Sequence, residues 1–161
     1  MMRHIKKFAA LLLAAICTMM VLTGCVDKAS LYDDTQQIAA GRTAYSATGY
    51  QGGYVMGDGS FDFTASADKL VGAVEAFDID VKNESTLVDC YTTSGKFKIL
   101  LVHTDNKQIV AEYIDDAYSD LVLPVGNYKV YLVGKDDAAF NVSISLYCFG
   151  ENVSWYEPSK K

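Results

Sequence analysis

The octapeptide FNVSISLY, residues 140–147, alternates between two kinds of side chain. Every second residue from Phe140 to Leu146 is large and apolar, and the residues between them are mostly small and polar. Because successive side chains of a β-strand point to opposite faces, this period of two predicts a strand with one buried face. The stretch therefore indicates a β-sheet packed on one side.

The same alternation runs through much of the chain after residue 60. Phe61 and Phe63 begin it, and Phe77, Ile79 and Val81 repeat it with charged residues between them. Further strands are predicted over residues 96–102, 108–114, 119–123 and 128–132, with turn signals at 94–95, 105–106, 123–128 and 134–137. About seven or eight strands, roughly 8 to 12 residues apart, predict an all-β fold. We expect an antiparallel, jelly-roll-like β-sandwich.

The last third of the pattern resembles a known family. A strand, the corner LPVGNY at 123–128, a second strand, the Gly134 turn and the strand from Phe140 follow one another. This order resembles the C-terminal half of bacterial pre-peptidase C-terminal-type domains and similar jelly-roll accessory modules. The resemblance implies a sandwich architecture. Such modules usually accompany a catalytic domain, and none is recognised in this sequence.

The beginning of the chain has the layout of an export signal. Arg3, Lys6 and Lys7 precede an apolar run over residues 8–22, and the small residues Thr23 and Gly24 follow it. The run is short for a membrane-spanning helix, which needs about 20 apolar residues, and polar residues come after it. We therefore expect residues 1–24 to be a cleaved signal peptide.

The end of this signal resembles the lipobox of bacterial lipoproteins. Leu22-Thr23-Gly24-Cys25 matches the form Leu-x-Gly/Ala-Cys at every position. The resemblance implies that Cys25 receives a diacylglyceryl group on its sulfur, becomes the first mature residue and holds the protein in the membrane by palmitate-like acyl chains. Two or more acyl chains anchor a protein stably in a bilayer. The alternative is an ordinary secretory signal with an unrelated cysteine.

The mature chain divides into three predicted parts. Residues 25–57 carry interleaved glycines and tyrosines without sustained periodicity and are predicted to be a flexible, lipid-anchored tether, with a short helix over 33–40 as the one regular element. Residues 58–150 are the predicted sandwich, and 151–161 a polar tail, in which Trp155 and Tyr156 are expected to pack back on the sandwich edge.

The charge of the mature chain narrows the class of partner. Removing the signal takes three of the 14 basic residues and none of the 20 acidic ones, which leaves a formal charge of −9. Nucleic acids and anionic membrane surfaces are bound by clustered lysine and arginine, so this balance argues against both as direct partners.

Two cysteines remain after the signal and the lipid site are set aside. Cys90 and Cys148 both lie on predicted strands. Outside the cytoplasm they form either a disulfide or two separate buried thiols. The bridge requires neighbouring strands with Cα atoms within roughly 7 Å of each other.

Candidate catalytic and metal-binding residues are sparse. His103 is the one histidine of the mature chain, and nothing in its spacing supplies the acid and serine of a catalytic triad, so we interpret it as a strand-end residue. Asp115, Asp116 and Asp120 are the candidate ligands of a calcium ion, which takes six to eight oxygens, although their spacing is not that of an EF-hand. Solvated surface carboxylates are the competing interpretation. No cofactor is expected.

Tyrosines are the remaining candidates for a binding surface. Sugars stack on exposed aromatic rings, and Tyr91, Tyr113, Tyr118, Tyr131 and Tyr147 are placed on an outward face by their alternation. The competing interpretation is that tyrosine suits strands and partly buried surfaces in general.

Together these patterns predict an extracytoplasmic lipoprotein, anchored in a bacterial cell membrane, whose sandwich binds a protein partner or an envelope glycan. The alternatives are a structural or assembly role, in which an open sheet edge pairs with another chain, and a hydrolase activity. An exposed aromatic or edge-strand surface without convergent titratable groups would indicate binding, and a long uncharged edge strand would indicate assembly. A deep pocket with convergent titratable groups would indicate an enzyme.

Overall fold

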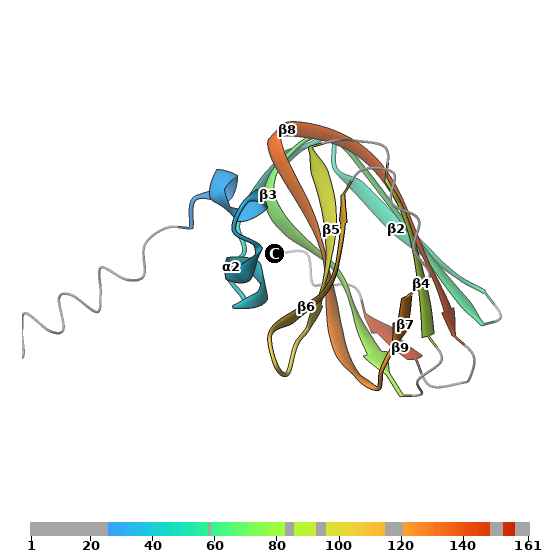
Figure 1. Cartoon of the computed structure of the whole chain (residues 1–161). Helices are drawn as coiled ribbons and strands as arrows, with labels where there is room; N and C mark the ends of the chain where they lie inside the picture. Colours follow the sequence, from blue (N-terminus) through green and yellow to red (C-terminus); the bar gives the residue numbers. More distant parts are fainter. Residues whose placement is uncertain are drawn as a thin grey trace, which may run out of the picture.

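The computed structural model describes residues 26–57, 59–82, 86–92, 96–114, 121–148 and 153–156 (Figure 1). Two short helices, η1 (Lys28–Tyr32) and α2 (Thr35–Ala39), precede the strands. The strands are β1 (Tyr45–Thr48), β2 (Gln51–Gly57), β3 (Ser60–Val81), β4 (Thr86–Thr92), β5 (Phe97–His103), β6 (Gln108–Ile114), β7 (Leu121–Leu123), β8 (Gly126–Cys148) and β9 (Val153–Tyr156). Every strand pairing is antiparallel, which confirms the expected all-β fold class.

Two long strands, β3 and β8, pair with each other along almost their whole length and change neighbours partway. The half in which residues 60–67 pair with 140–147 is flanked by β2 and β4, with β7 beyond β4. The other half is flanked by β1 and β9 on one side and by β5 on the other, with β6 beyond β5. The paired strands bend over in Figure 1, so one continuous sheet supplies both layers of a sandwich.

Aromatic contacts connect the two layers. The ring of Phe97 in β5 stacks on Phe140 in the other half of β8, with centroids 4.2 Å apart. Phe77 likewise contacts Phe61 and Phe63 from the opposite half of β3, with centroids 5.1 and 5.0 Å away. Since these partners lie on different layers, the side chains of the two inner faces interdigitate as in a sandwich core.

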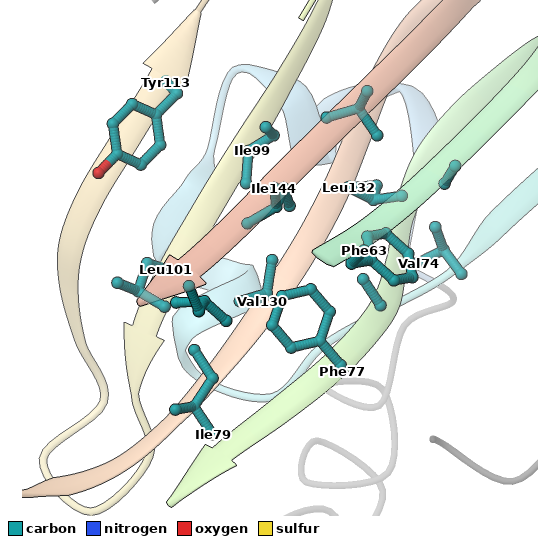
Figure 2. Close-up of a cluster of buried hydrophobic side chains, with 14 of the residues drawn as sticks. Phe63, Val74, Phe77, Ile79, Ile99, Leu101, Tyr113, Val130, Leu132 and Ile144 are labelled. Atoms are coloured by element: carbon teal, nitrogen blue, oxygen red, sulfur yellow. The ribbon is translucent and has the colours of Figure 1, made fainter. Parts of the chain in front are cut away.

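The main core cluster is made by the alternating residues that the sequence singles out (Figure 2). The apolar residues of FNVSISLY, from Phe140 to Leu146, are all buried in it. A register shift between Glu75 and Phe77 inserts one extra residue in β3. This bulge changes which parity faces inward, so Val74 before it and Phe77 after it both reach the core.

The corner between the layers is built on two opposed glycines. Gly72 pairs with Gly134, and a Cβ on Gly72 would lie 2.1 Å from the carbonyl oxygen of Ala44. Next to Gly134, β8 has extra residues relative to β3, and Asp136 and Asp137 have positive φ angles of 52° and 58°. The turn predicted at 134–137 is therefore wrong. The excess residues form a bulge that bends β8 instead of ending it.

The other predicted corner is confirmed. Leu123 ends β7, and β8 begins at Gly126. The Tyr128 hydroxyl donates a hydrogen bond of 2.8 Å to the carbonyl oxygen of Pro124, and this bond closes the turn. Burial raises the pKa of Tyr128.

A second cluster lies on the outer face of the layer that contains β5. Leu31, Ile38 and Ala39 from the two short helices cover the side chains of this cluster, which also includes Ala73, Leu100, Val102, Tyr131 and Val133. The part of this layer around β5 is therefore buried on both faces. A strand covered on both faces needs apolar residues at consecutive positions, which explains the nearly unbroken apolar run of β5.

Charged contacts fasten the helical segment to the sheet. Lys98, although buried, donates a hydrogen bond of 2.8 Å to Glu112, and its ammonium lies 4.2 Å from the centre of the Tyr32 ring. Lys135 reaches Asp33 with Nζ–O distances of 2.7 and 2.9 Å. The hydrogen bond to Asp33 raises the pKa of Lys135.

The sheet extends beyond the predicted sandwich, residues 58–150, at both ends. The segment predicted as a flexible tether instead contributes two short helices and two strands from Val26 onward. Leu31, Ile38 and Ala39 of the helices are buried because they find apolar partners on the sheet. The supposed tail contributes β9, which pairs with residues 78–81 of β3 at the sandwich edge. The folded unit thus extends over residues 26–156 of the described chain.

Candidate functional site

The strands β1 and β2 act as one interrupted edge strand, which we call the open edge (residues 45–57). Tyr45 pairs with Gly72 and Gly57 pairs with Ser60, and the same register holds on both sides of the break at residues 49–50. Within the described part of the chain, no strand pairs with the other side of the open edge. One row of backbone N–H and C=O groups therefore faces outward.

The open edge contains no charged residue. Its sequence is YSATGYQGGYVMG, without lysine, arginine, aspartate, glutamate or proline. Natural sheet edges are usually protected against pairing by such residues or by being short. All of β2 is exposed, and the exposed fraction is 52% for Tyr54, 68% for Val55 and 58% for Met56. The open edge thus has the form expected of an assembly or binding surface.

One face of the open edge continues the hydrophobic core to the surface. Tyr54 and Met56 pair with Phe63 and Phe61, and directly paired residues project to the same face. The Tyr54 ring stacks on the Phe61 ring, with centroids 5.4 Å apart and planes inclined by 27°. A strand added beyond β2 would find an apolar surface on this face as well as backbone groups at the edge.

A glycine of β2 gives a second indication that another chain or a ligand approaches the open edge closely. Gly53 has no atom within 4 Å of the position a Cβ would occupy, and its φ lies outside the left-handed region. The described fold therefore places no steric or conformational demand for glycine at this position. Glycine inside a strand often marks a place where another backbone or a ligand comes close.

Two of the predicted stacking tyrosines are not on the surface. Tyr113 is 5% exposed and belongs to the main core, and Tyr131 is 4% exposed beneath the helical segment. Their outward placement was wrong for two different reasons. Tyr113 pairs with Ile99 and projects with it into the main core, so it lies on the inner face of the layer. Tyr131 lies on the outer face, but the helical segment covers it there. The side chains of Tyr91 and Tyr147, and all of Tyr118, lie outside the described part of the structure.

A half-buried ion cluster lies beside Tyr131. The Lys129 ammonium is 3.1 Å from Glu75 and 3.8 Å from Asp78. Burial raises the pKa of Tyr131, and the negative charges of Glu75 and Asp78 raise it further. Lys129 lies on β8 and Glu75 and Asp78 lie on β3, so the positive charge of the lysine offsets the negative charges of the two carboxylates. The ion pairs therefore stabilise the pairing of these two strands.

The metal prediction falls outside the described chain. Asp115, Asp116 and Asp120 lie in the segment 115–120, which the structure does not describe. Among the residues it does describe, no group of three or more histidine, cysteine, aspartate or glutamate side chains is placed to hold a metal ion.

His103 packs at the end of its strand. Its ring meets the Tyr128 ring edge-on, with centroids 4.9 Å apart. A Cβ on Gly126 would lie 2.6 Å from Nε2 of His103, so the imidazole lies directly against the backbone of the corner. These contacts give the ring a packing role.

The register of β4 on β8 separates the two cysteines. Cys90 pairs with Ile144, whereas Cys148 pairs with Thr86, four positions away along each strand. At about 3.3 Å per residue this is roughly 13 Å, beyond the roughly 7 Å that a disulfide spans. The alternative of two separate thiols fits this register, and the bridge does not.

The lipidation prediction lies outside the described residues, because the description begins at Val26, one residue after Cys25. Within the described chain, no helix has the length and hydrophobicity needed to cross a membrane.

Comparison of the sequence with protein-family models and with curated proteins finds no match. Several solved structures are distantly similar to this chain. Peruvianin-I, a cysteine peptidase from Thevetia peruviana latex, is 13% identical, with a TM-score of 0.42 and coverage of 69% of this chain and 71% of that one. Procruciferin, an 11S globulin from Brassica napus, is 14% identical, with a TM-score of 0.39 and coverage of 64% and 24%. A recombinant oxalate oxidase in complex with glycolate is 10% identical, with a TM-score of 0.41 and coverage of 68% and 56%.

Two features of the amino-acid sequence could have revealed the open edge. Tyr54 and Met56 alternate with Gly53 and Val55, and the dipeptide Asp58-Gly59 separates them from the next strand. Asp-Gly between alternating segments is among the strongest hairpin signals. The hairpin was not predicted because the high glycine content of this segment suggested a flexible linker.

Proposed function

We propose that this protein is a membrane-anchored extracytoplasmic lipoprotein whose β-sandwich binds a protein partner along the open edge. The partner adds an extended segment next to β2 and continues the sheet by one strand. The observation that carries this proposal is the uncharged, exposed edge strand over residues 45–57. The lipobox at Cys25 supports the membrane location.

The open edge offers two sources of binding energy. Main-chain hydrogen bonds to an added strand contribute about 0.5–1.5 kcal/mol each, net of the bonds to water that they replace. Full burial of a valine, methionine or aromatic side chain contributes about 1.5–3 kcal/mol, and Tyr54, Val55 and Met56 are each half or more exposed in the free edge. Backbone bonds supply affinity in this mode of recognition, and alternate side chains supply specificity.

A protein partner is favoured over a glycan by the position of the tyrosines. A sugar-stacking platform needs exposed rings on a rigid face, and the structure buries Tyr113 and Tyr131, two of the rings predicted to form it. Among the side chains that the structure describes, the exposed tyrosines are Tyr45, Tyr50 and Tyr54, and they lie in or beside the edge strands.

Site-specific photo-crosslinking in native membranes tests the proposal. A photoreactive residue replaces Gln51, which is exposed in β2, and the same membranes carry either Val55→Lys or the matched change Val122→Lys. Both valines are exposed, at 68% and 54%, and lie on strands that each pair with one neighbour in the described sheet. A lysine on the edge disfavours strand addition, because its charge would be buried by the incoming chain.

We expect a discrete crosslinked product that Val55→Lys abolishes and Val122→Lys preserves. A product of twice the chain's mass would identify the partner as a second copy and the function as assembly. The absence of any product from Gln51, or equal loss in both variants, would refute binding along the open edge.

A further inference from the structure

The first residues after Cys25 belong to the folded domain. Val26 packs against the second core cluster. The carboxylate of Asp27 accepts a hydrogen bond of 3.1 Å from the backbone N–H of Ala29, and the Asp27 carbonyl accepts one from Ser30. These bonds cap η1, so regular structure begins at Lys28. No stretch of chain between Cys25 and the domain is long enough to act as a flexible linker.

The covalent geometry converts this observation into a distance. Consecutive Cα atoms are 3.8 Å apart, so Cys25 lies within about 4 Å of Val26 and within about 11 Å of Lys28. A flexible tether over residues 25–57 would instead have a root-mean-square reach of about 30 Å. If Cys25 carries the acyl chains, the domain surface next to η1 is confined to the headgroup layer.

That surface is the corner where Gly72 pairs with Gly134. The side chain of Lys28 lies against Gly72, because a Cβ on this glycine would be 3.1 Å from the Cβ of Lys28. Lys135, next to Gly134, holds Asp33 immediately after η1. We call this region, formed by η1 and the Gly72–Gly134 pair, the anchor corner.

The charge at the anchor corner is locally balanced. Four lysines around it each pair with a carboxylate: Lys69 with Asp137, Lys96 with Asp136, Lys98 with Glu112 and Lys135 with Asp33. The mature chain as a whole carries −9. Anionic lipids therefore repel the rest of the domain more than this corner.

We infer that the domain lies directly on the bilayer through the anchor corner, with no flexible tether, and that the far end of β8 points away from the membrane. Gly126, where β8 begins, is eight residues from Gly134, which is about 26 Å along the strand. This inference rests on the proposed lipid anchor at Cys25. The membrane partner is the phospholipid headgroup layer itself.

Energy transfer to labelled lipids tests the inference. The full-length lipidated protein is reconstituted in vesicles of phosphatidylcholine and phosphatidylglycerol that contain a headgroup-labelled acceptor lipid. A donor dye is attached through an unnatural amino acid either at Lys69, near the anchor corner, or at Val125, beside Gly126. Both side chains are exposed. The control chain carries a Gly/Ser spacer of about 20 residues between Cys25 and Val26, which restores a reach of about 25 Å.

We expect stronger transfer from position 69 than from position 125, and we expect the spacer to weaken transfer from position 69 and to remove the difference. Equal transfer from both positions in the chain without the spacer, or no effect of the spacer, would overturn the inference. Mass spectrometry of the N-terminal peptide is measured on the same sample. An unmodified Cys25 would overturn the proposed anchor together with this inference, whereas an acylated Cys25 with equal transfer would overturn this inference alone.

Discussion

The substitution Ile38→Ala distinguishes an integral N-terminal segment from a tether. Ile38 lies in α2 and is fully buried in the second core cluster, against side chains of the sheet. If the segment were a tether, the side chain would be solvated and its truncation would leave the free energy of unfolding unchanged. The structure predicts a large loss instead.

The magnitude follows from burial. Truncation of a buried isoleucine to alanine costs about 2–5 kcal/mol, through lost transfer energy and the cavity left behind. Alanine has the better helix propensity by a few tenths of a kcal/mol, so the change in α2 itself opposes the loss slightly. We therefore expect Ile38→Ala to lower the free energy of unfolding by about 3 kcal/mol. The unfolding entropy of about 2.1 cal/mol/K per residue gives about 0.29 kcal/mol/K for residues 26–161, so Tm falls by about 10 °C.

The assay is thermal and urea unfolding of the chain from Val26 to Lys161. Ile114→Ala is the matched control, because Ile114 is 46% exposed on the edge strand β6. We expect a fall in Tm of no more than about 3 °C for the control, which corresponds to less than about 1 kcal/mol. Equal, small effects of both substitutions would show that α2 is not packed on the sheet and would refute the account of the second cluster.

Three further predictions concern individual residues. Gly72→Ala should lower the free energy of unfolding by about 3 kcal/mol or more, because the new Cβ would lie 2.1 Å from a backbone oxygen at a residue with positive φ. The control Gly53→Ala, which has open space around the new Cβ, should leave Tm within a few degrees of the unsubstituted chain. Similar losses of stability in both variants would contradict the corner geometry. The pKa of Tyr131 is raised in the folded state, so the stabilisation by its protonated hydroxyl is complete below the unfolded-state pKa near 10 and is lost as the pH rises above that value. The free energy of unfolding, measured across about pH 9–12, should therefore fall less steeply with pH in Tyr131→Phe than in the unsubstituted chain. Glu112→Gln leaves the buried ammonium of Lys98 without its carboxylate and should lower the free energy of unfolding in urea by about 1.5–3 kcal/mol. Lys98→Met should lower it less, because the partly exposed Glu112 is then rehydrated. A larger loss for Lys98→Met than for Glu112→Gln would refute this account of the ion pair.

Alternation was a reliable guide wherever one face of a strand is wet. FNVSISLY and the segments at Phe61–Phe63 and Phe77–Val81 were predicted as strands with the correct buried residues, because each has polar neighbours on the outer face. The same rule placed Tyr113 and Tyr131 on the surface. It failed for Tyr131 because the helical segment covers the outer face of the sheet at that point. It failed for Tyr113 because this residue projects with Ile99 into the main core, so the inward face of β6 had been assigned incorrectly.

The short helix predicted over 33–40 is confirmed by α2. The open edge and the packing of the helical segment on the sheet were missed for a different reason. Residues 26–57 contain few apolar residues in any one element, so no window of the sequence shows a sustained period. Leu31 and Ile38 are buried only because the sheet presents an apolar outer face to them. The absence of charge over 45–57 was visible in the sequence, but only the pairing with β3 turned it into an uncharged edge.

The sequence by itself determined the β-strand class and the inward side of most strands, because these depend on local alternation. The tertiary structure alone decided that β3 and β8 cross from one layer to the other, that the cysteines lie four positions apart, and that the domain begins immediately after Cys25. These features depend on strand register and on contacts between distant segments. A single residue of slip or one bulge changes them, whereas it leaves the local pattern intact.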